Sequence, residues 1–380
     1  MPAFEIYTAP RIVFGAGALG KLPDLLPPTA ARVLLVVGAR SAERSGLLAR
    51  LERLLPVGAV ARCEREPHVD DVDRVVEQGR AAGCDAVVAV GGGAVLDCGK
   101  AASGMLTNEG SLVDYLEGVG RGLQINRPPL PMVAAPTTAG TGSEVTKNAV
   151  ISGPGFKKSV RSPLLIPRLA LVDPELLRGL PAAVAASCGM DALTQLVEAY
   201  LSKNASAFTD GLALQGIAAA GASLLEACRG DSDDAREGMA LASLLGGVCL
   251  ANAGLGAVHG FASPLGALFP VSHGVACAAL LPQVVRANLE AGGAALRRRF
   301  ARVAEALTGE RFADEQEAVA RGLERLEALQ RELGIPRLSA LGITEDRLPE
   351  IARGSRGSSM RYNPVELSDE QLLGILRAAL

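Results

Sequence analysis

The segment Ala86-Val-Val-Ala-Val-Gly-Gly-Gly-Ala-Val-Leu-Asp-Cys-Gly-Lys100 joins a short apolar run to a glycine triplet and then to residues typical of a helix. Consecutive apolar residues bounded by turn residues indicate a strand that is buried on both faces. Glycines after such a strand let backbone N–H groups approach a ligand, and a helix N-terminus favours negative charge. The segment predicts a strand–turn–helix unit that either binds a pyrophosphate or needs glycine only for tight packing.

The rest of the first half repeats this pattern. Buried strands are predicted at 33–37 and 131–135, and an amphipathic helix after the first of them extends to Leu55. Further strands are expected at 149–151 and 169–172. Strands that alternate with helices are typical of parallel βαβ units.

The composition changes after Asp173-Pro174. From there to Leu380 the chain is rich in Ala, Leu and Glu, with long helical periods and almost no strand signal. We therefore expect two domains, an α/β dinucleotide-binding domain over residues 1–175 and a helical domain over 176–380. The predicted fold class is α/β plus all-α, with a Rossmann-like parallel sheet in the first domain.

Bulk properties exclude several classes of function. The net charge of −3 provides no basic surface for nucleic acid. The first residues lack the pattern of a secretion signal, and Gly, Pro or charge interrupts each apolar stretch before the roughly 20 residues of a membrane span. Seven scattered cysteines without a CxxC pair indicate reduced thiols. We expect a cytoplasmic protein that binds neither nucleic acid nor membranes.

A second loop of small residues, Pro136-Thr-Thr-Ala-Gly-Thr-Gly-Ser-Glu144, follows the strand predicted at 131–135. Its hydroxyls and open backbone suit phosphate, ribose or nicotinamide-amide contacts at the carboxyl end of a strand. Two such loops on adjacent strands favour a nucleotide site over packing alone. The candidate cofactor contacts from the two loops are Gly91, Gly92, Gly93, Thr137, Thr138, Thr141 and Ser143.

The second half contains two of the chain's three histidines, and these are metal-ligand candidates. Asp191 and Gln195 are four residues apart on a helix that Ser187 is expected to cap, so both should lie on one face. His259 and His273 each precede a glycine in an apolar, small-residue setting. Burying two imidazoles there is costly without partners, and one carboxylate with two imidazoles suits Fe²⁺ or Zn²⁺.

Together these segments resemble the iron-containing, or group III, alcohol dehydrogenases. The similarity runs through nearly the whole chain, in ordered motifs. These are residues 10–15, 91–100 and 136–144, Lys158 with Ser162-Pro163, Asp173-Pro174, the Asp191 helix, the His259 and His273 segments, and Tyr362-Asn-Pro364.

The resemblance implies a fold, an activity and site residues. The fold is dehydroquinate synthase-like, a Rossmann-like half and a helical half with the active site in the cleft between them. The activity is that of an NAD(P)-dependent alcohol dehydrogenase or aldehyde reductase, in which a divalent metal polarises the substrate oxygen. The family's metal ligands are one aspartate and three histidines, and these place Asp191, His259 and His273 as metal-binding and catalytic residues. Asp97 and Lys158 join the candidate cofactor contacts.

This sequence departs from the family pattern at two positions of the metal site. Gln195 stands where the family has its third histidine ligand, and Ser263 stands where it has a further active-site histidine. An amide oxygen is neutral and ligates borderline ions more weakly than imidazole does. We expect Gln195 to complete the ligand set and the affinity for the metal, Fe²⁺ before Zn²⁺, to be lower than is usual in the family. Proton transfer would use the Ser263 hydroxyl, water or the cofactor ribose.

A third departure concerns the cofactor. Members that prefer NAD often have an aspartate directly after the strand predicted here at 33–37, where it binds the ribose 2′-OH. This chain has Gly38 there, and Arg40 follows. Without the carboxylate a 2′-phosphate is not repelled, and Arg40 could pair with it. The sequence thus favours NADP(H), with both residues as cofactor contacts.

Three other functions remain open. A dehydroquinate synthase-like lyase needs basic groups around a phosphorylated acid, but residues 255–280 contain no Lys or Arg. A metal-free reductase of the maleylacetate reductase type would fit Gln195 and Ser263, and a nucleotide-binding protein without catalysis is the remaining option. We expect a small-molecule alcohol or aldehyde substrate that the sequence does not specify further, and Phe261 and Phe269 suggest a partly apolar pocket. By analogy the chain forms a homodimer or larger homo-oligomer, and a strand near Phe4–Tyr7 could pair across its two-fold axis.

Overall fold

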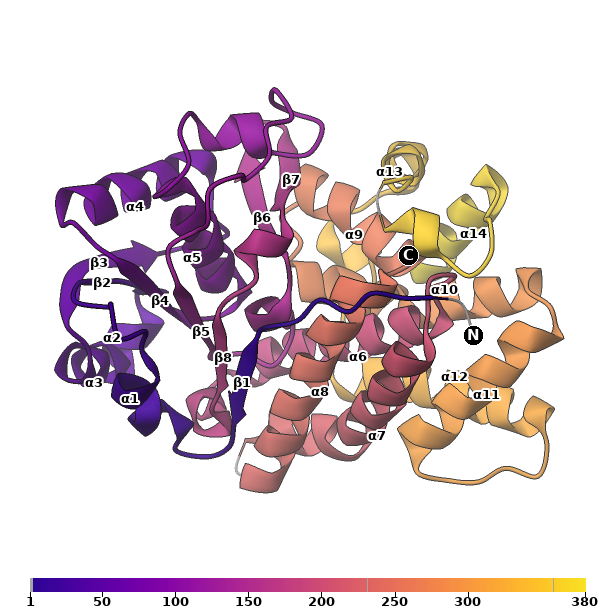
Figure 1. Cartoon of the computed structure of the whole chain (residues 1–380). Coiled ribbons are helices and arrows are strands. Elements are labelled where there is room, and N and C mark those ends of the chain that lie inside the picture. The colour runs from indigo at the N-terminus through magenta and orange to yellow at the C-terminus, as the bar shows by residue number, and fades with distance from the viewer. Residues whose placement is uncertain (1–2, 231, 358) are drawn as a thin grey trace. The chain divides into compact units, whose positions relative to one another are not determined.

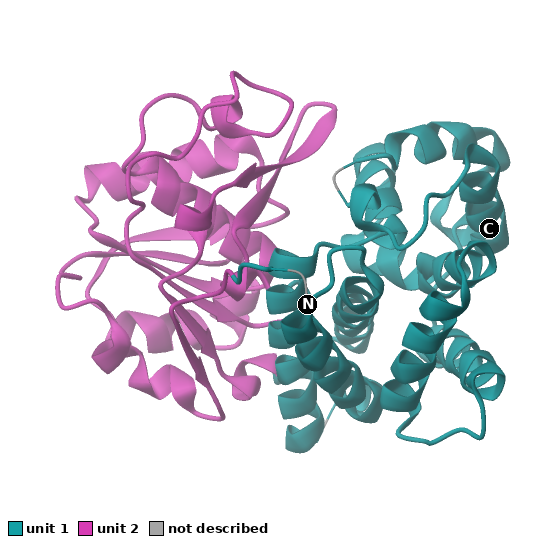
Figure 2. Ribbon diagram, turned by 45° about the vertical axis from the view of Figure 1, so that its right-hand side comes forward, with its two compact units in different colours: residues 1–6, 139–141, 178–380 teal, residues 7–138, 142–177 magenta. Residues whose placement is uncertain are grey.

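The computed structural model describes residues 3–230, 232–357 and 359–380. Its internal contacts divide the chain into two compact units (Figure 2). The sheet unit comprises residues 7–138 and 142–177, and the helical unit comprises the described residues up to 6, residues 139–141 and the chain from 178. The predicted domains, 1–175 and 176–380, stay a prediction. The sequence did not indicate that the residues up to 6 and residues 139–141 would group with the helical unit.

The sheet unit contains one six-stranded parallel sheet, in the order β1-β8-β5-β4-β2-β3 (Figure 1). Its strands are β1 (Arg11–Phe14), β2 (Val33–Gly38), β3 (Val57–Cys63), β4 (Ala86–Gly91), β5 (Met132–Pro136) and β8 (Leu169–Val172). The predicted α/β class with a parallel sheet is confirmed. The sequence analysis missed β1 and β3. These are the two edge strands, and they are only partly buried, so their apolar patterns are weak.

Helices cover both faces of this sheet (Figure 1). Val33, Leu35 and Val37 of β2 pack with the short helices α1 (Leu22–Leu25) and α3 (Leu47–Leu54). The alternate residues of β2 pack on the other face with α4 (Val69–Ala81) and α5 (Gly93–Met105). Burial on both faces explains why the inner strands are continuous apolar runs.

The strand order reverses between β2 and β4. The chain passes from β2 to its neighbour β3 on one side, and the next strand, β4, pairs with the opposite side of β2. At such a switch point the carboxyl ends of the strands form a ligand crevice in open α/β sheets. Gly91 of β4 is in register with Pro136 of β5, and Thr137 N–H donates to the Gly91 carbonyl at 2.9 Å. The two predicted loops therefore leave the sheet side by side.

Two further segments differ in part from expectation. Strands β6 (Asn148–Gly153) and β7 (Phe156–Arg161) form a separate antiparallel hairpin, which includes the strand predicted at 149–151. Residues 3–9 form no strand within the single chain, and Phe4 is exposed. The strand expected near Phe4–Tyr7 would pair with a second copy, so it stays a prediction.

The helical unit contains no strand among the described residues from 178 onward, as the sequence predicted. Its helices are α6 (Ala182–Leu201), α7 (Ala207–Arg229), α8 (Asp233–Ala253), α9 (Ala257–Leu268), α10 (His273–Ala291), α11 (Ala294–Thr308), α12 (Glu315–Glu332), α13 (Leu348–Gly354) and α14 (Asp369–Ala379). Helix α6 packs against α7, α8 and α10 and is buried continuously from Gly189. It begins directly after Pro181, so Ser187 does not cap it, because the alanine-rich turn before Ser187 is already helical.

Helix α7 alone among the described residues is long and apolar enough to span a bilayer by length and composition. A helix that meets these criteria was not expected from the sequence, in which Gly, Pro or charge interrupts each apolar stretch. The helix packs against α6, α8 and α11 within the helical unit.

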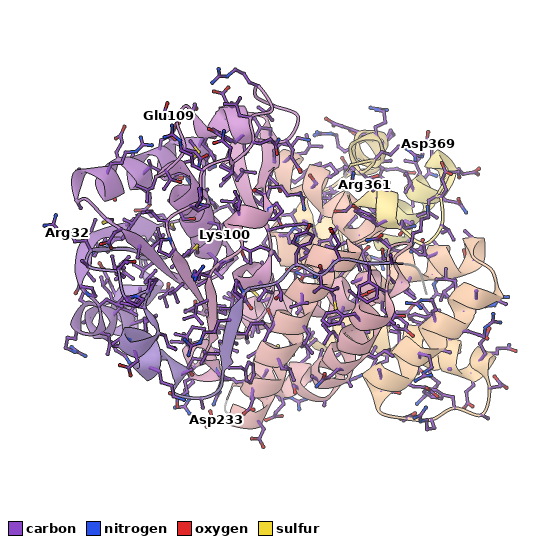
Figure 3. The ribbon with its side chains drawn as sticks, viewed as in Figure 1. Arg32, Lys100, Glu109, Asp233, Arg361 and Asp369 are labelled. Carbon is purple, nitrogen blue, oxygen red and sulfur yellow. The ribbon has the colours of Figure 1, made fainter. Side chains whose placement is uncertain are left out.

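A buried polar network ties α5 to the chain that follows β5. Asp97 accepts hydrogen bonds from the Ser143 hydroxyl and, at 2.9 Å, from Val150 N–H. Lys100, labelled in Figure 3, is fully buried, lies 3.2 Å from Asp97 and donates to the Thr146 hydroxyl at 2.9 Å. The network fixes the loop that carries the second candidate cofactor segment.

Glu144 lies beside this network as a buried carboxyl group. It is 1% exposed, and neither of its oxygens has a hydrogen-bond partner among the described residues. Burial raises the pKa of Glu144 from 4.5 to about 7, against the attraction of the Lys100 charge. Because the folded-state pKa lies above the unfolded value, the stability that this group contributes is full below about pH 4.5 and is lost as the pH rises through about 7.

We therefore expect Glu144→Gln to flatten the dependence of stability on pH. Between pH 5 and pH 8.5 the natural protein should lose up to about 3 kcal/mol more unfolding free energy than the variant. Urea unfolding at both pH values measures this difference. Glu52→Gln, at an exposed position, is the control and should follow the natural protein. Parallel curves for the natural protein and Glu144→Gln would contradict the prediction.

Candidate functional site

Three helices of the helical unit bring together four potential metal ligands. Asp191 lies on α6, His259 on α9, and His273 and Cys277 on α10. One ligand atom from each residue lies within 4.8 Å of the others. Asp191, His259 and Cys277 are buried, whereas the side chain of His273 is 34% exposed. The structure thus brings the predicted Asp191, His259 and His273 together and leaves the cluster open on the His273 side.

Glycines allow α9 and α10 to pack closely against neighbouring segments of the helical unit. A Cβ at Gly274 would lie 2.4 Å from the Ser187 carbonyl of α6, and one at Gly260 would lie 2.9 Å from the Ser355 carbonyl. The glycine that follows each histidine therefore serves packing. It lets α9 and α10 present their first turns at the cluster.

A glutamate that the sequence analysis missed orients His259. Glu198 Oε2 lies 2.7 Å from His259 Nδ1, and Glu198 Oε1 accepts the Val258 N–H at the start of α9, also at 2.7 Å. When Nδ1–H donates to this carboxylate, Nε2 is free to bind a metal. A sequence signal existed, because Glu198 interrupts an apolar run on α6 and shares a helix face with Asp191 and Gln195.

The charges of the cluster support one another. Burial opposes the ionisation of Asp191, but His273 and His259 hold the pKa of its carboxyl below the ordinary value. Burial also opposes the ionisation of Cys277, and the same two imidazoles lower the pKa of its thiol. The Cys277 charge, with Asp191, raises the pKa of His273 in turn, against burial. The two imidazoles therefore favour the anionic forms of the Asp191 carboxyl and the Cys277 thiol.

The residues present fit a divalent metal. Asp191 Oδ1 is buried without a hydrogen-bond partner, although it lies 3.3 Å from His259 Nε2 and 3.6 Å from His273 Nε2. A buried carboxylate oxygen left in this state costs about 1–3 kcal/mol or more. A cation between the three atoms would satisfy it, and this donor set suits Fe²⁺ or Zn²⁺.

Gln195 does not present the atom that the sequence analysis expected. Its amide nitrogen donates to Asp191 Oδ2 and to the Gly140 carbonyl, both at 3.2 Å. Its oxygen has no hydrogen-bond partner and lies beside Gly246 of α8, 3.3 Å from where a Cβ would be. Because both neighbours of the nitrogen are acceptors, the opposite orientation of the amide is unfavourable. The expectation that Gln195 offers an oxygen ligand is not supported by this arrangement.

The glycine triplet in the sheet unit combines the two roles weighed from the sequence. A Cβ at Gly91 would lie 2.5 Å from Val95, so this glycine serves packing of α5 on the sheet. Gly92 precedes the first turn of α5 and Gly93 begins it, and both are half-buried. A Cβ at Gly92 would meet only Thr138, at 3.4 Å. The first N–H groups of a helix lack intrahelical partners, so these glycines suit a phosphate.

The remaining candidate cofactor contacts divide into three groups. Gly38 ends β2, and exposed Arg40 precedes the short helix α2 (Ser41–Arg44). Thr137 and Thr138 follow β5, so these residues lie at the carboxyl ends of the two strands that flank β4. Asp97 and Ser143 bond to each other and hold the loop. Lys158 is exposed on β7, and Thr141 belongs to the helical unit.

Comparisons with known proteins cover both units. Residues 9–174 match the family model described as iron-containing alcohol dehydrogenase, and residues 185–380 match the C-terminal model of the Fe-containing alcohol dehydrogenase family. The chain is 36% identical to the probable alcohol dehydrogenase EutG of Escherichia coli strain K12, over 97% of this chain and 93% of that protein.

Solved structures agree with these matches. A crystal structure of 1,3-propanediol oxidoreductase is similar with a TM-score of 0.90 and 35% identity, over 100% of both chains. The NAD⁺ complex of sulfoacetaldehyde reductase from Bifidobacterium kashiwanohense is similar with a TM-score of 0.89 and 28% identity, over 100% of this chain and 99% of that one. The chain belongs to the iron-containing alcohol dehydrogenase family and is an NAD(P)-dependent oxidoreductase that interconverts alcohols and aldehydes or ketones.

Proposed function

We propose that this oxidoreductase holds a divalent metal, Fe²⁺ or Zn²⁺, on Asp191, His259 and His273 and uses NADP(H) as its hydride carrier. The observation that carries the metal proposal is the buried Asp191 Oδ1, which has no hydrogen-bond partner beside two imidazole nitrogens. An ion bound there would supply Lewis-acid polarisation of the substrate oxygen. The substrate carbon would exchange a hydride with the nicotinamide.

The protein's own groups have distinct tasks in this reaction. Asp191 contributes negative charge, and Glu198 keeps the His259 ring in one orientation. His273 lies on the exposed side of the cluster, where a small substrate can arrive. Ser263, one turn after His259 on α9, is exposed, so a proton received by its hydroxyl can pass on to water.

Phe261 and Phe269 were the two aromatic candidates for the substrate pocket, and neither offers an unoccupied apolar surface. Phe261 is fully buried on α9, and the Arg347 guanidinium lies 5.0 Å from the centre of the Phe269 ring. Alcohols and aldehydes in general are the substrate class. The assembly as a homodimer or larger oligomer and the cytoplasmic location stay predictions, which light scattering and cell fractionation test.

His273→Ala is expected to reduce turnover to background while NADP(H) affinity changes little. The substitution removes a metal ligand but leaves the carboxyl ends of β2, β4 and β5 unchanged. Steady-state rates, metal content after purification without chelator, and NADPH fluorescence titration measure the three effects. His68→Ala, which changes the chain's remaining histidine, is the control. Full turnover by metal-free natural protein would instead support a metal-free reductase.

The cofactor preference has a separate test. Gly38 leaves no carboxylate at the end of β2, and Arg40 is exposed directly after it. We expect kcat/KM to be higher with NADPH than with NADH. Arg40→Ala should lower the NADPH value roughly tenfold and change the NADH value little, because a charge-assisted contact to the 2′-phosphate is lost. Arg44→Ala, at the other end of the short helix α2 that Arg40 precedes, is the matched control. Equal or better kcat/KM with NADH in the natural protein would rule out the preference.

A further inference from the structure

We propose that the Cys277 thiolate is the fourth protein ligand of the metal, in place of the Gln195 oxygen that was expected as a ligand, and that Gln195 instead positions Asp191. This inference rests on the proposed metal site. It adds a sulfur atom to a donor set of one carboxylate oxygen and two imidazole nitrogens.

The distances within the cluster carry the first step. Cys277 Sγ lies 3.7 Å from His259 Nε2 and 3.8 Å from His273 Nε2, while Asp191 Oδ1 lies 3.3 and 3.6 Å from the same two nitrogens. A tetrahedral ion with bonds of about 2.0–2.3 Å separates its ligand atoms by about 3.3–3.7 Å. These four separations therefore already match such an ion to within a few tenths of an ångström, and one ligand atom from each of the four residues lies within 4.8 Å of the others.

The placement of Cys277 on its helix is the second step. His273 and Cys277 are one turn apart on α10, so their side chains lie on the same face. Cys277 is fully buried, and its sulfur is in contact with both histidine rings. A structural thiol in a core would pack against apolar groups, whereas this one points at nitrogen atoms that can ligate metal.

The orientation of Gln195 is the third step. An amide nitrogen has no lone pair to offer a cation, and it is the nitrogen of Gln195 that faces Asp191. Its bond to Asp191 Oδ2 leaves Oδ1 directed at the two imidazoles, without a hydrogen-bond partner. Gln195 and Cys277 thus have different roles. The Gln195 amide orients the Asp191 carboxylate, and the Cys277 thiol supplies the fourth donor atom.

The sulfur ligand predicts a metal preference. Thiolate is a soft ligand that selects Zn²⁺ and Fe²⁺ over hard ions such as Mg²⁺ and Mn²⁺. A thiolate also gives Co²⁺, a spectroscopic substitute for Zn²⁺, an intense near-ultraviolet charge-transfer absorption that oxygen and nitrogen ligands do not produce.

Co²⁺ substitution of the full-length protein tests the inference. The natural protein and Cys228→Ser, which changes another thiol of the helical unit, should bind about one Co²⁺ per chain and show the charge-transfer band. Cys277→Ser should lose the band and bind Co²⁺ at least about tenfold more weakly. Gln195→Ala should keep the band, because the amide is not a ligand.

A second measurement does not depend on the folding of any variant. X-ray absorption of the zinc-loaded natural protein should show one sulfur at about 2.3 Å together with nitrogen or oxygen at about 2.0–2.1 Å. Bound metal without a sulfur neighbour, or a band that persists in Cys277→Ser, would overturn the role of Cys277 and leave the proposed metal-dependent activity standing. Failure of the natural protein to bind Co²⁺ or Zn²⁺ while it turns over would overturn both.

Discussion

The helical unit is organised around polar groups that a buried helix must accommodate. Helix α6 is enclosed by α7, α8 and α10, and on one face it carries Asp191, Gln195 and Glu198, all less than 10% exposed. Buried charges are costly unless they are paired, and each of these groups is paired differently. Glu198 is satisfied by the first turn of α9 and by the ring of His259. That contact places one imidazole, and the start of α10 places the other, so the burial of α6 determines where the cluster forms.

In the sheet unit, the important feature is that accessible backbone N–H groups gather at one edge of the sheet. Its strands are covered on both faces, so the carboxyl ends are where polar ligands can reach N–H groups. Because the strand order reverses between β2 and β4, the chain segments that follow these two strands lead away in opposite directions along the sheet. Gly91 provides close packing of α5, and the half-buried Gly92 provides access, so neighbouring glycines in one triplet have different physical reasons.

The sequence predicted those features that have one strong local pattern. The strands β2, β4 and β5 are continuous apolar runs, and the scarcity of histidine directed attention to His259 and His273. The edge strands β1 and β3 were missed because half-buried strands have diluted patterns. Cys277 was not singled out because a buried ligand thiol and a small core residue look alike along a chain. The orientation of Gln195 depends on the Gly140 carbonyl, 55 residues away, which no local pattern indicates.

The two unusual residues of the cluster are best understood as a pair. An amide in place of the third imidazole, with nothing else changed, would leave three ligands and a weakly held ion. A thiol one turn beyond His273 adds a donor from α10, opposite the helix that lacks one. The amide is then available to bond the second oxygen of Asp191, a contact that would otherwise need water in a buried site. In the proposed site, separate helices would supply complementary parts of one coordination sphere, which is the arrangement expected of a retained metal site with altered ligands rather than of one that has been lost.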